Sequence, residues 1–368
     1  MSRVLDTFLA LARIDSPTGR ERCVAEYLAA ALGDAGCAVR FDETQPLTGA
    51  DVGNLIATLP GTAPGPVIAL SAHMDCVNPC EGVEPVVENG VVRSAGETVL
   101  GGDDKVGLAA IVEAIRRLAE SGASHPEIHA VCTVSEESGL VGAKALAAGD
   151  CVADVCLVLD ADGPVGGIVT AAPTHYTFAA TFTGKAAHAG VEPEKGISAI
   201  GMAAAAIEAM ELGRLDARTT ANIGTIVGGS ATNVIAPRCD LTGECRSLDR
   251  VKADATRDAM DAALHRAADL SGGQVDVTWT LAYEGFSFDE GSAALALVEG
   301  ACADIGVAPH RFATGGGSDG NVFAAHGVPT LVLASGMSKV HSTDEELEVA
   351  QLERLADLLV AVALRAAR

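Results

Sequence analysis

Aromatic and cationic residues are both scarce in this chain of 368 residues. Aromatic residues make up 3% of it and hydrophobic residues 49%, so Ala, Val and Leu supply most of the volume of any core. The 25 Lys and Arg residues face 49 Asp and Glu residues, which gives a formal charge of -24. No Lys/Arg-rich run offsets this charge, and phosphate backbones and anionic lipids repel an acidic chain. The composition therefore argues against a nucleic acid or a membrane as partner.

Paired cysteines and long apolar runs are also lacking. The ten cysteines stand singly, with no Cys-x-x-Cys pair of the zinc-ribbon type. Cys76 and Cys80 lie close in sequence to His73, but we expect them to be buried and reduced rather than bound to metal. The N-terminal MSRVLD lacks the apolar core of a signal peptide, and no apolar run is long enough to span a membrane. We therefore expect a cytoplasmic protein, and the length favours two domains.

Histidine and acidic side chains recur where apolar segments end. Residues 67–72 are typical of a buried strand, and on a strand the i and i+2 side chains of His73 and Asp75 share one face. Other apolar segments lead to further residues of this kind, namely Glu136 and Glu137, Asp160, and His341. Because the carboxyl ends of strands form the ligand-binding edge of open α/β sheets, we expect these side chains to meet. Singly, each is better explained as a helix cap, a loop residue or a hydrogen-bonded structural histidine.

As a set, these side chains suit a pair of metal ions. Two histidines and three carboxylates can hold two zinc-like ions if one carboxylate bridges them. Paired metals polarise a carbonyl and lower the pKa of bound water, and a further carboxylate can move its proton. Asp103 precedes a predicted helix at 104–119, and a helix N-terminus favours a carboxylate.

These motifs, in this order, resemble the di-zinc exopeptidase family that includes peptidase T, aminoacylase and the desuccinylases. Segments 100–105 (LGGDDK) and 315–320 (GGGSDG) look most like peptidase T. The resemblance implies two zinc ions, which manganese or cobalt could replace. It also implies that Asp103 bridges the ions and is joined to Asp104 by a cis peptide bond. The other ligands that it implies are His73 and Asp160 for one ion, and Glu137 and His341 for the other.

The resemblance also assigns roles beyond metal binding. Glu136 would be the general base, and Asp75 would orient His73. His188 would reach the site of a neighbouring subunit and stabilise the oxyanion. Two further residues would hold the polar end of the substrate, Asn233 and Arg246. Without the resemblance, we would interpret His188 as a turn residue, Asn233 as a loop residue and Arg246 as a surface residue of a strand.

The glycine-rich segment 315–320 also fits the dinucleotide-binding pattern G-x-G-x-x-G. The helix after it, 321–326, is short, and the strand 328–334 is not followed by an acidic residue that could hold a ribose. We therefore expect this loop to shape a substrate pocket, with Ser318 and Asn321 as contacts.

A change of pattern from about residue 172 indicates an inserted domain. Its predicted elements follow the β-α-β-β-α-β order of a ferredoxin-like fold: strand 177–183, helix 197–212, strands 223–227 and 239–245, helix 251–270 and strand 275–281. We expect an α/β catalytic domain, with a mixed sheet flanked by helices, from residues 1–172 and 285–368, and an α+β insert at 173–284. The resemblance implies that the insert is a lid and the contact of a homodimer.

The C-terminal segment is expected to form a helix over 345–368. Thr343 and Glu346 have the spacing of a capping box at its start.

Together these features predict a metal-dependent hydrolase of small peptides, in the first place an aminopeptidase that acts on tripeptides. An N-acyl-amino-acid deacylase, another amidohydrolase or a dipeptidase is the alternative, because the same ligand set serves all of them. An inactive metal-binding scaffold fits less well because Glu136 is retained.

Overall fold

The computed structural model describes residues 2–147, 149–288 and 290–368. Contacts divide the chain into two compact units, and each is described here by itself. The first comprises Met1–Thr170, Ser287–Ala313 and Ser318–Arg368, and the second comprises Ala171–Phe286 and Thr314–Gly317. Within the described residues, no helix is both long enough and apolar enough to cross a lipid bilayer.

The first unit is built on a nine-stranded mixed sheet. Its main path runs in the order β1 (Ala38–Phe41), β2 (Leu55–Leu59), β6 (Ile128–Thr133), β3 (Ile68–His73), β7 (Val155–Ala161), β16 (Thr330–Ala334), β8 (Gly167–Ala172) and β14 (Phe286–Ser287), and β15 (His310–Ala313) pairs with β8. β3 is parallel to β6 and β7, and β7 is parallel to β16. β1, β2 and β8 join antiparallel. The six residues of β3 are all buried, as unbroken apolar runs in a covered parallel sheet require.

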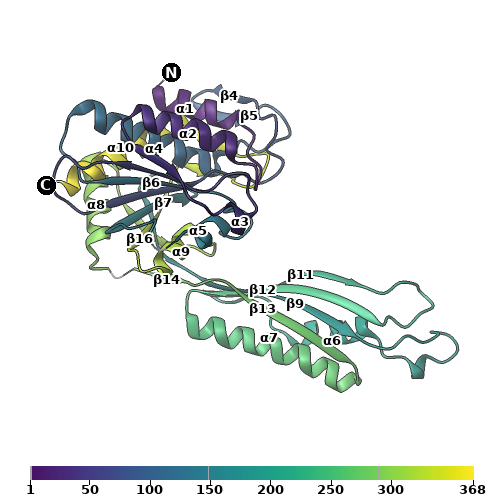
Figure 1. Cartoon of the computed structure of the whole chain (residues 1–368). Coiled ribbons are helices and arrows are strands. Elements are labelled where there is room, and N and C mark those ends of the chain that lie inside the picture. The colour runs from purple at the N-terminus through teal and green to yellow at the C-terminus, as the bar shows by residue number, and fades with distance from the viewer. Residues whose placement is uncertain (1, 148, 289) are drawn as a thin grey trace. The chain divides into compact units, whose positions relative to one another are not determined.

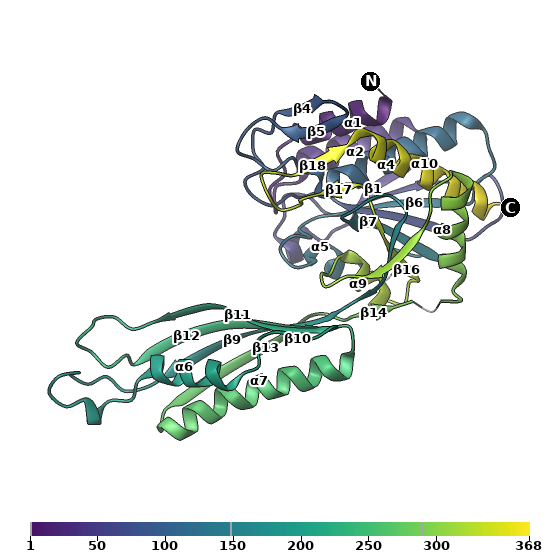
Figure 2. The same ribbon diagram turned by 180° about the vertical axis from the view of Figure 1, so that it is seen from behind.

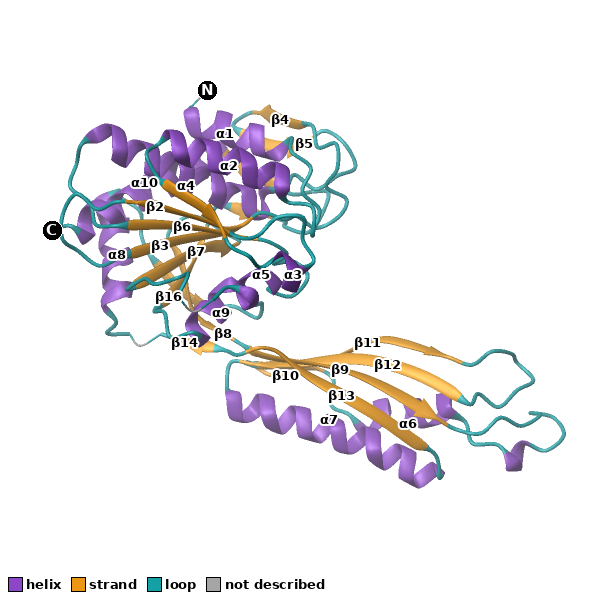
Figure 3. Ribbon diagram, in the orientation of Figure 1, coloured by secondary structure: helices purple, strands orange, loops and turns teal. Residues whose placement is uncertain are grey.

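Helices cover both faces of this sheet (Figure 3). On one side lie α1 (Arg3–Ala12), α2 (Arg22–Asp34), α4 (Gly102–Ser121) and α10 (Val349–Ala366), as Figure 1 shows. α9 (Asp319–Ala325) packs against β7 and β16. The remaining helices are α3 (Gln45–Thr48), α5 (Val141–Ala145) and α8 (Ala293–Asp304). The predicted α/β fold with a mixed sheet flanked by helices is therefore confirmed.

The core of the first unit holds α4 between the sheet and its neighbouring helices. Leu108 and Ile111 of α4 and Leu355 and Leu359 of α10 are all buried in it. Each such side chain stabilises the fold by about 1.5–3 kcal/mol through the apolar surface that it removes from water. This packing holds the N-terminal end of α4, which carries Asp103, at a defined place beside β3.

A small second sheet in the first unit corrects the prediction for the C-terminal segment. It has the order β17 (Met337–Ser338), β18 (Glu346–Glu348), β5 (Val91–Ser94) and β4 (Pro85–Glu88). The predicted helix over 345–368 was wrong in its first residues, since α10 begins only at Val349. The expected capping box of Thr343 and Glu346 does not form, because Leu347 pairs with Val92 and the Glu346 carboxylate forms ion pairs with Arg93 and Lys339.

The second unit is an antiparallel sheet covered by two helices. Its strand order is β10 (Gly213–Asp216), β11 (Thr219–Gly228), β12 (Arg238–Ser247), β9 (Thr174–Thr183) and β13 (Gln274–Tyr283). α6 (Ala199–Ala209) and α7 (Arg250–Ser271) pack together on one face of the sheet (Figure 2). A separate core forms between them, in which Phe178, Phe182 and Leu264 are buried.

Candidate metal centre

The parallel strands of the first unit end at a common edge. His73 is the last residue of β3 and is paired with Thr133, the last residue of β6. Glu136 and Glu137 follow β6 after a turn at Ser135, whose φ is +53°. Asp160 lies near the end of β7, which is parallel to β3. Strand pairing therefore delivers four of the predicted side chains to one edge of the sheet.

The Asp103 carboxylate lies between two histidines. Its Oδ1 atom is 3.0 Å from Nε2 of His73, and its Oδ2 atom is 3.1 Å from Nε2 of His341. The same His341 nitrogen is 3.1 Å from Oε1 of Glu137. Residues from three other parts of the chain, His73, Glu137 and His341, thus lie around one buried carboxylate, which is the geometry that a bridging ligand needs.

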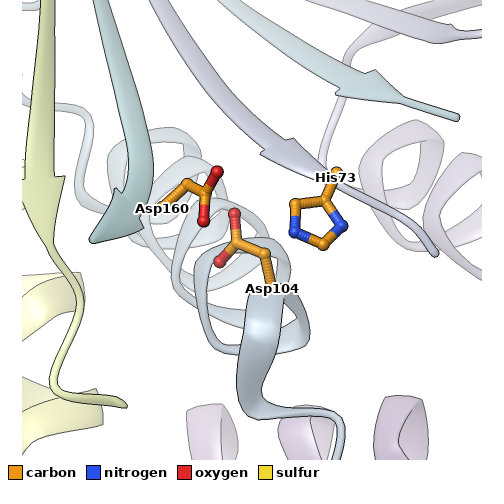
Figure 4. A group of neighbouring side chains, drawn as sticks. All are labelled: His73, Asp104 and Asp160. Carbon is orange, nitrogen blue, oxygen red and sulfur yellow. The ribbon is translucent and has the colours of Figure 1, made fainter. Parts of the chain in front are cut away.

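Two groups of side chains could each hold a metal ion. One consists of His73, Asp103 and Glu137, and the other of His73, Asp104 and Asp160; within each group the donor atoms all lie within 4.8 Å of one another. Figure 4 shows the carboxylates of Asp104 and Asp160 directed towards each other, with the His73 ring beside them. The sequence prediction placed Asp103 with Asp160, whereas in the structure Asp104 is the aspartate grouped with it. The peptide bond between Asp103 and Asp104 is cis, as the resemblance implied.

Imidazole and carboxylate charges balance one another in this cluster. Burial acts to lower the pKa of His73, but the carboxylates of Asp103 and Asp75 raise it well above its ordinary value. Hydrogen bonds to Asp103 and Glu137 raise the pKa of His341 to about 10. Against the effect of burial, the two imidazoles hold the pKa of Asp103 well below its usual range. The cluster therefore stabilises positive charge beside Asp103.

Buried carboxyl groups and one unpaired oxygen atom support a fit between these residues and a divalent cation. Burial raises the pKa of the carboxyl groups of Asp104, Asp160 and Glu136 well above their ordinary values. Oδ2 of Asp104 is buried and accepts no hydrogen bond from any described residue. Carboxylate oxygens and imidazole nitrogens are the donor atoms that zinc-like ions prefer. A divalent ion would supply the charge and the partners that these groups lack.

Asp75 supports the turn that carries the two glutamates. Its Oδ1 atom accepts a hydrogen bond from the backbone N–H of Glu136 at 3.0 Å, and its Oδ2 atom accepts one from Glu137 at 3.3 Å. Thr18 donates a further hydrogen bond to Oδ2 at 2.7 Å. Nδ1 of His73 lies 2.9 Å from the backbone oxygen of Asp75 and 3.4 Å from its carboxylate. The side chain of Asp75 is thus bound more closely to the glutamate turn than to the histidine.

Three of the residues predicted to contact substrate lie in the second unit. His188 is exposed and forms an isolated β-bridge with Val234, so it lies beside Asn233, whose carbonyl accepts from the backbone N–H of Ala189. Arg246, on β12, directs its Nε and Nη2 atoms to the carboxylate of Glu244, at 3.1 and 2.9 Å. The guanidinium of Arg246 is therefore held in one orientation.

Ser318 and Asn321 instead form a local structure of their own. The Ser318 side chain accepts from the backbone N–H of Gly320, and Oδ1 of Asn321 accepts from the backbone N–H of Ser318 at 3.1 Å, so the two make a capping box for α9. Both side chains are buried. Their hydrogen bonds fix the loop before α9.

Comparison with known proteins decides the family. Residues 69–365 match the description Peptidase family M20/M25/M40. The chain belongs to this peptidase family. The protein YqjE of Bacillus subtilis is 44% identical over 366 residues, covering 100% of this chain and 99% of that protein. The prediction of a metallopeptidase, a hydrolase that acts on peptides, is thereby confirmed.

Solved structures of M20-type peptidases superpose on the whole of this chain. The aminopeptidase PepT from Bacillus cereus is similar with a TM-score of 0.94 and 43% identity, covering 100% of this chain and 98% of that one. A tripeptidase from Staphylococcus aureus is similar with a TM-score of 0.96 and 37% identity, at the same coverage. The resemblance to the peptidase T group is therefore confirmed.

The sequence analysis did not assign three side chains of this M20 peptidase to the metal centre. Asp104 was noted only as the partner of a cis bond, and Thr18, which donates to Asp75, carries no motif. Glu345, which accepts hydrogen bonds from the loop before Asp103, was assigned to a helix. Its spacing of four residues from His341 was the one available signal, and such spacing is uninformative without a structure.

Proposed function

We propose that this peptidase is an aminopeptidase that removes the N-terminal residue of tripeptides, with two zinc ions at the centre around Asp103. The observation that carries the proposal is the position of the Asp103 carboxylate, with one oxygen 3.0 Å from His73 and the other 3.1 Å from His341. The similarity to a PepT aminopeptidase and to a tripeptidase over the whole chain supports the substrate class.

Asp103 would be shared by the two ions. His73 and Asp160 would complete one site, and Glu137 and His341 the other, while Asp104 lies beside Asp160 and His73. When bound, the ions would polarise the scissile carbonyl and lower the pKa of the attacking water. Zinc suits this mixture of imidazole and carboxylate ligands, and manganese or cobalt is the alternative.

Glu136 would move the proton in the reaction. Its carboxylate would take a proton from the attacking water and return it to the amine that leaves. Burial raises the pKa of Glu136, which brings a carboxylate closer to the pH at which it must both accept and donate. Asp75 would hold Glu136 in place through the backbone N–H groups of the glutamate turn.

The second unit would provide the groups that recognise substrate. His188 would stabilise the oxyanion as a hydrogen-bond donor, and Asn233 and Arg246 would bind the polar end of the peptide. Arg246 suits a carboxylate because its guanidinium offers a planar fork of donors, and Glu244 already fixes its orientation. The capping box of Ser318 and Asn321 would shape the loop of the pocket.

A homodimer through the second unit is part of the proposal. β10 pairs only with the first three residues of β11, Thr219–Ala221. Among the described residues, the rest of β11 pairs with β12 alone, so its other edge is unpaired. This edge exposes apolar side chains, with 68% of Val227 and 50% of Ile226 accessible. An unpaired apolar strand edge readily pairs with a second copy of itself. His188 would then act in the site of the partner subunit.

We also propose a cytoplasmic location. All ten cysteines are free, which is typical of a compartment that keeps thiols reduced.

A substrate screen on zinc-loaded protein tests the proposed function. Tripeptides with a free N-terminus should be cleaved in preference to the same tripeptides with an acetylated N-terminus, to dipeptides and to N-acyl amino acids. Glu136→Gln protein is the matched inactive control. Faster hydrolysis of N-acyl amino acids or of dipeptides would replace the tripeptide assignment, and equal rates for wild type and Glu136→Gln would remove the mechanism.

A further inference from the structure

Glu345, a buried residue four positions after His341, accepts hydrogen bonds from the loop that carries Asp103. Glu345 has 2% of its surface exposed. Its Oε2 atom accepts hydrogen bonds from the backbone N–H groups of Leu100 and Gly101, at 2.8 and 2.9 Å. Its Oε1 atom accepts one from the backbone N–H of Asp103, at 3.0 Å. One side chain thus satisfies three backbone donors of a single short loop.

The loop needs such a partner because it forms the start of α4. The first N–H groups of a helix have no acceptor within the helix, and buried donors left unpaired are costly. The helix also starts irregularly, since Asp103 and Asp104 have non-helical φ/ψ angles of -81°/104° and -119°/35°. A carboxylate at this point satisfies the donors and interacts favourably with the helix N-terminus.

Gly102 leaves room for the Glu345 carboxylate. A Cβ atom at position 102 would lie 2.8 Å from Oε1 of Glu345, closer than real Cβ contacts. The backbone of Asp103 is held from its other side as well, because the thiol of Cys76 donates to its carbonyl oxygen at 3.5 Å. The backbone of Asp103 therefore has little freedom, and its carboxylate is aimed by these two contacts.

Glu345 also links Asp103 to His341. Nε2 of His341 lies 3.1 Å from Oδ2 of Asp103, although the two residues are distant in the sequence. Glu345 lies four residues after His341, and its carboxylate accepts hydrogen bonds from the loop that carries Asp103. This one carboxylate therefore connects the His341 segment to the Asp103 loop. Loss of the hydrogen bonds of Glu345 would let His341 and Asp103 shift relative to each other.

We infer that Glu345 is a positioning residue of the metal centre, which holds Asp103 and the His341 segment in register and thereby sets the affinity for divalent metal. Both of its oxygens accept backbone hydrogen bonds, so its action on a metal ion passes through Asp103 and His341. The inference rests on the proposed role of Asp103 as a metal ligand.

The test is the zinc affinity of the full-length Glu345→Gln protein. The amide keeps the size of the side chain but replaces one oxygen with an NH2 group that cannot accept from the backbone donors. Residues that orient metal ligands typically change metal affinity 10–100-fold when they are lost. We expect the dissociation constant for Zn²⁺, measured by competition with a chromophoric chelator, to rise by about 10- to 100-fold.

Two control variants separate positioning from general stability. Asp344→Asn removes an exposed carboxylate from the adjacent position and should leave the zinc affinity at the wild-type value. Leu359→Ala opens a cavity in α10, where Leu359 is buried, and should lower the melting temperature without changing the zinc affinity. A zinc affinity that falls as much in Leu359→Ala as in Glu345→Gln would overturn the inference.

A second variant covers the case in which Glu345→Gln does not fold. Glu345→Asp keeps both oxygens on a shorter stem, and we expect it to weaken zinc binding less than the amide does. Wild-type zinc affinity in either folded variant would overturn the inference.

Asp103→Asn separates a failure of the role of Glu345 from a failure of the proposed metal centre. If it loses zinc while the Glu345 variants keep it, only the role of Glu345 fails, and if it too binds zinc like the wild type, the proposed centre itself fails.

Discussion

The backbone N–H of Glu136 donates a hydrogen bond to the carboxylate of Asp75, with 3.0 Å between the nitrogen and Oδ1. Asp75 follows β3 and Glu136 follows β6, so this bond ties together the ends of two parallel strands. The same carboxylate accepts from the N–H of Glu137. The turn that would supply both a proton carrier and a metal ligand is thus fixed by a residue that touches neither metal nor substrate in the proposed mechanism.

Asp75→Asn should therefore impair catalysis through position rather than charge alone. The amide retains one acceptor oxygen, so one of the two backbone N–H groups loses its partner and the glutamate turn loosens. We expect kcat to fall about 10- to 100-fold with a smaller change in KM. Steady-state kinetics on a tripeptide measure this split. Asp34→Asn, which alters an exposed aspartate in α2, is the control and should behave as wild type; an unchanged kcat in Asp75→Asn would contradict the assignment.

Glu136 and Glu137 should respond differently to the same substitution. Glu136→Gln should reduce kcat about 100- to 10,000-fold because a positioned proton carrier is lost, while zinc binding persists. Glu137→Gln should weaken zinc binding, because Oε1 of Glu137 lies beside His341 and Asp103. Kinetics together with the zinc content after dialysis separate the two effects. Loss of zinc in both variants to the same degree would show that the pair acts as one ligand set.

Acid should weaken the second unit through Glu244. A hydrogen bond that the Glu244 carboxylate accepts from His175, together with Arg246, lowers the pKa of Glu244 from 4.5 to about 2. A carboxyl group whose pKa is lower in the folded state stabilises the fold above the unfolded value near 4.5, and that stabilisation is lost as the pH falls towards 2. Glu244→Gln should therefore lower the melting temperature at pH 7, and its difference from wild type should shrink between pH 4.5 and 2. A difference that stays constant over this range would contradict the prediction.

The β11 edge should control the oligomeric state. Val227→Glu places a charge on the exposed apolar edge, and we expect it to convert a dimer to a monomer. Val251→Glu is the matched control, because Val251 is 77% exposed on α7, on the helix-covered face of the second unit. Light scattering after size-exclusion chromatography gives the mass of each. Monomeric wild type, or a Val227→Glu dimer of wild-type stability, would rule out this edge as the interface.

The central sheet could be predicted from local pattern because its strands are unbroken apolar runs that end in polar residues. The segment before His73 and the segment before Asp160 both form buried strands, and their parallel pairing brings the ends together. The general rule for open α/β sheets is sufficient to expect a site at that edge.

The features that local pattern missed come from partners that are distant in the sequence. The start of the C-terminal helix was misplaced because Leu347 pairs with Val92, a contact that residue spacing near 345 does not contain. Likewise, the grouping of Asp104 with Asp160 and the grip of Glu345 on the Asp103 loop depend on the tertiary structure. Helix capping by Ser318 and Asn321 is local, but it competes with a substrate role for the same side chains.

The most direct test of the account is a crystal structure of the zinc-loaded protein with data collected at the zinc absorption edge. The account predicts two anomalous peaks on either side of the Asp103 carboxylate, one beside His73 and one beside His341. A single peak, or peaks that lie away from Asp103, would contradict it.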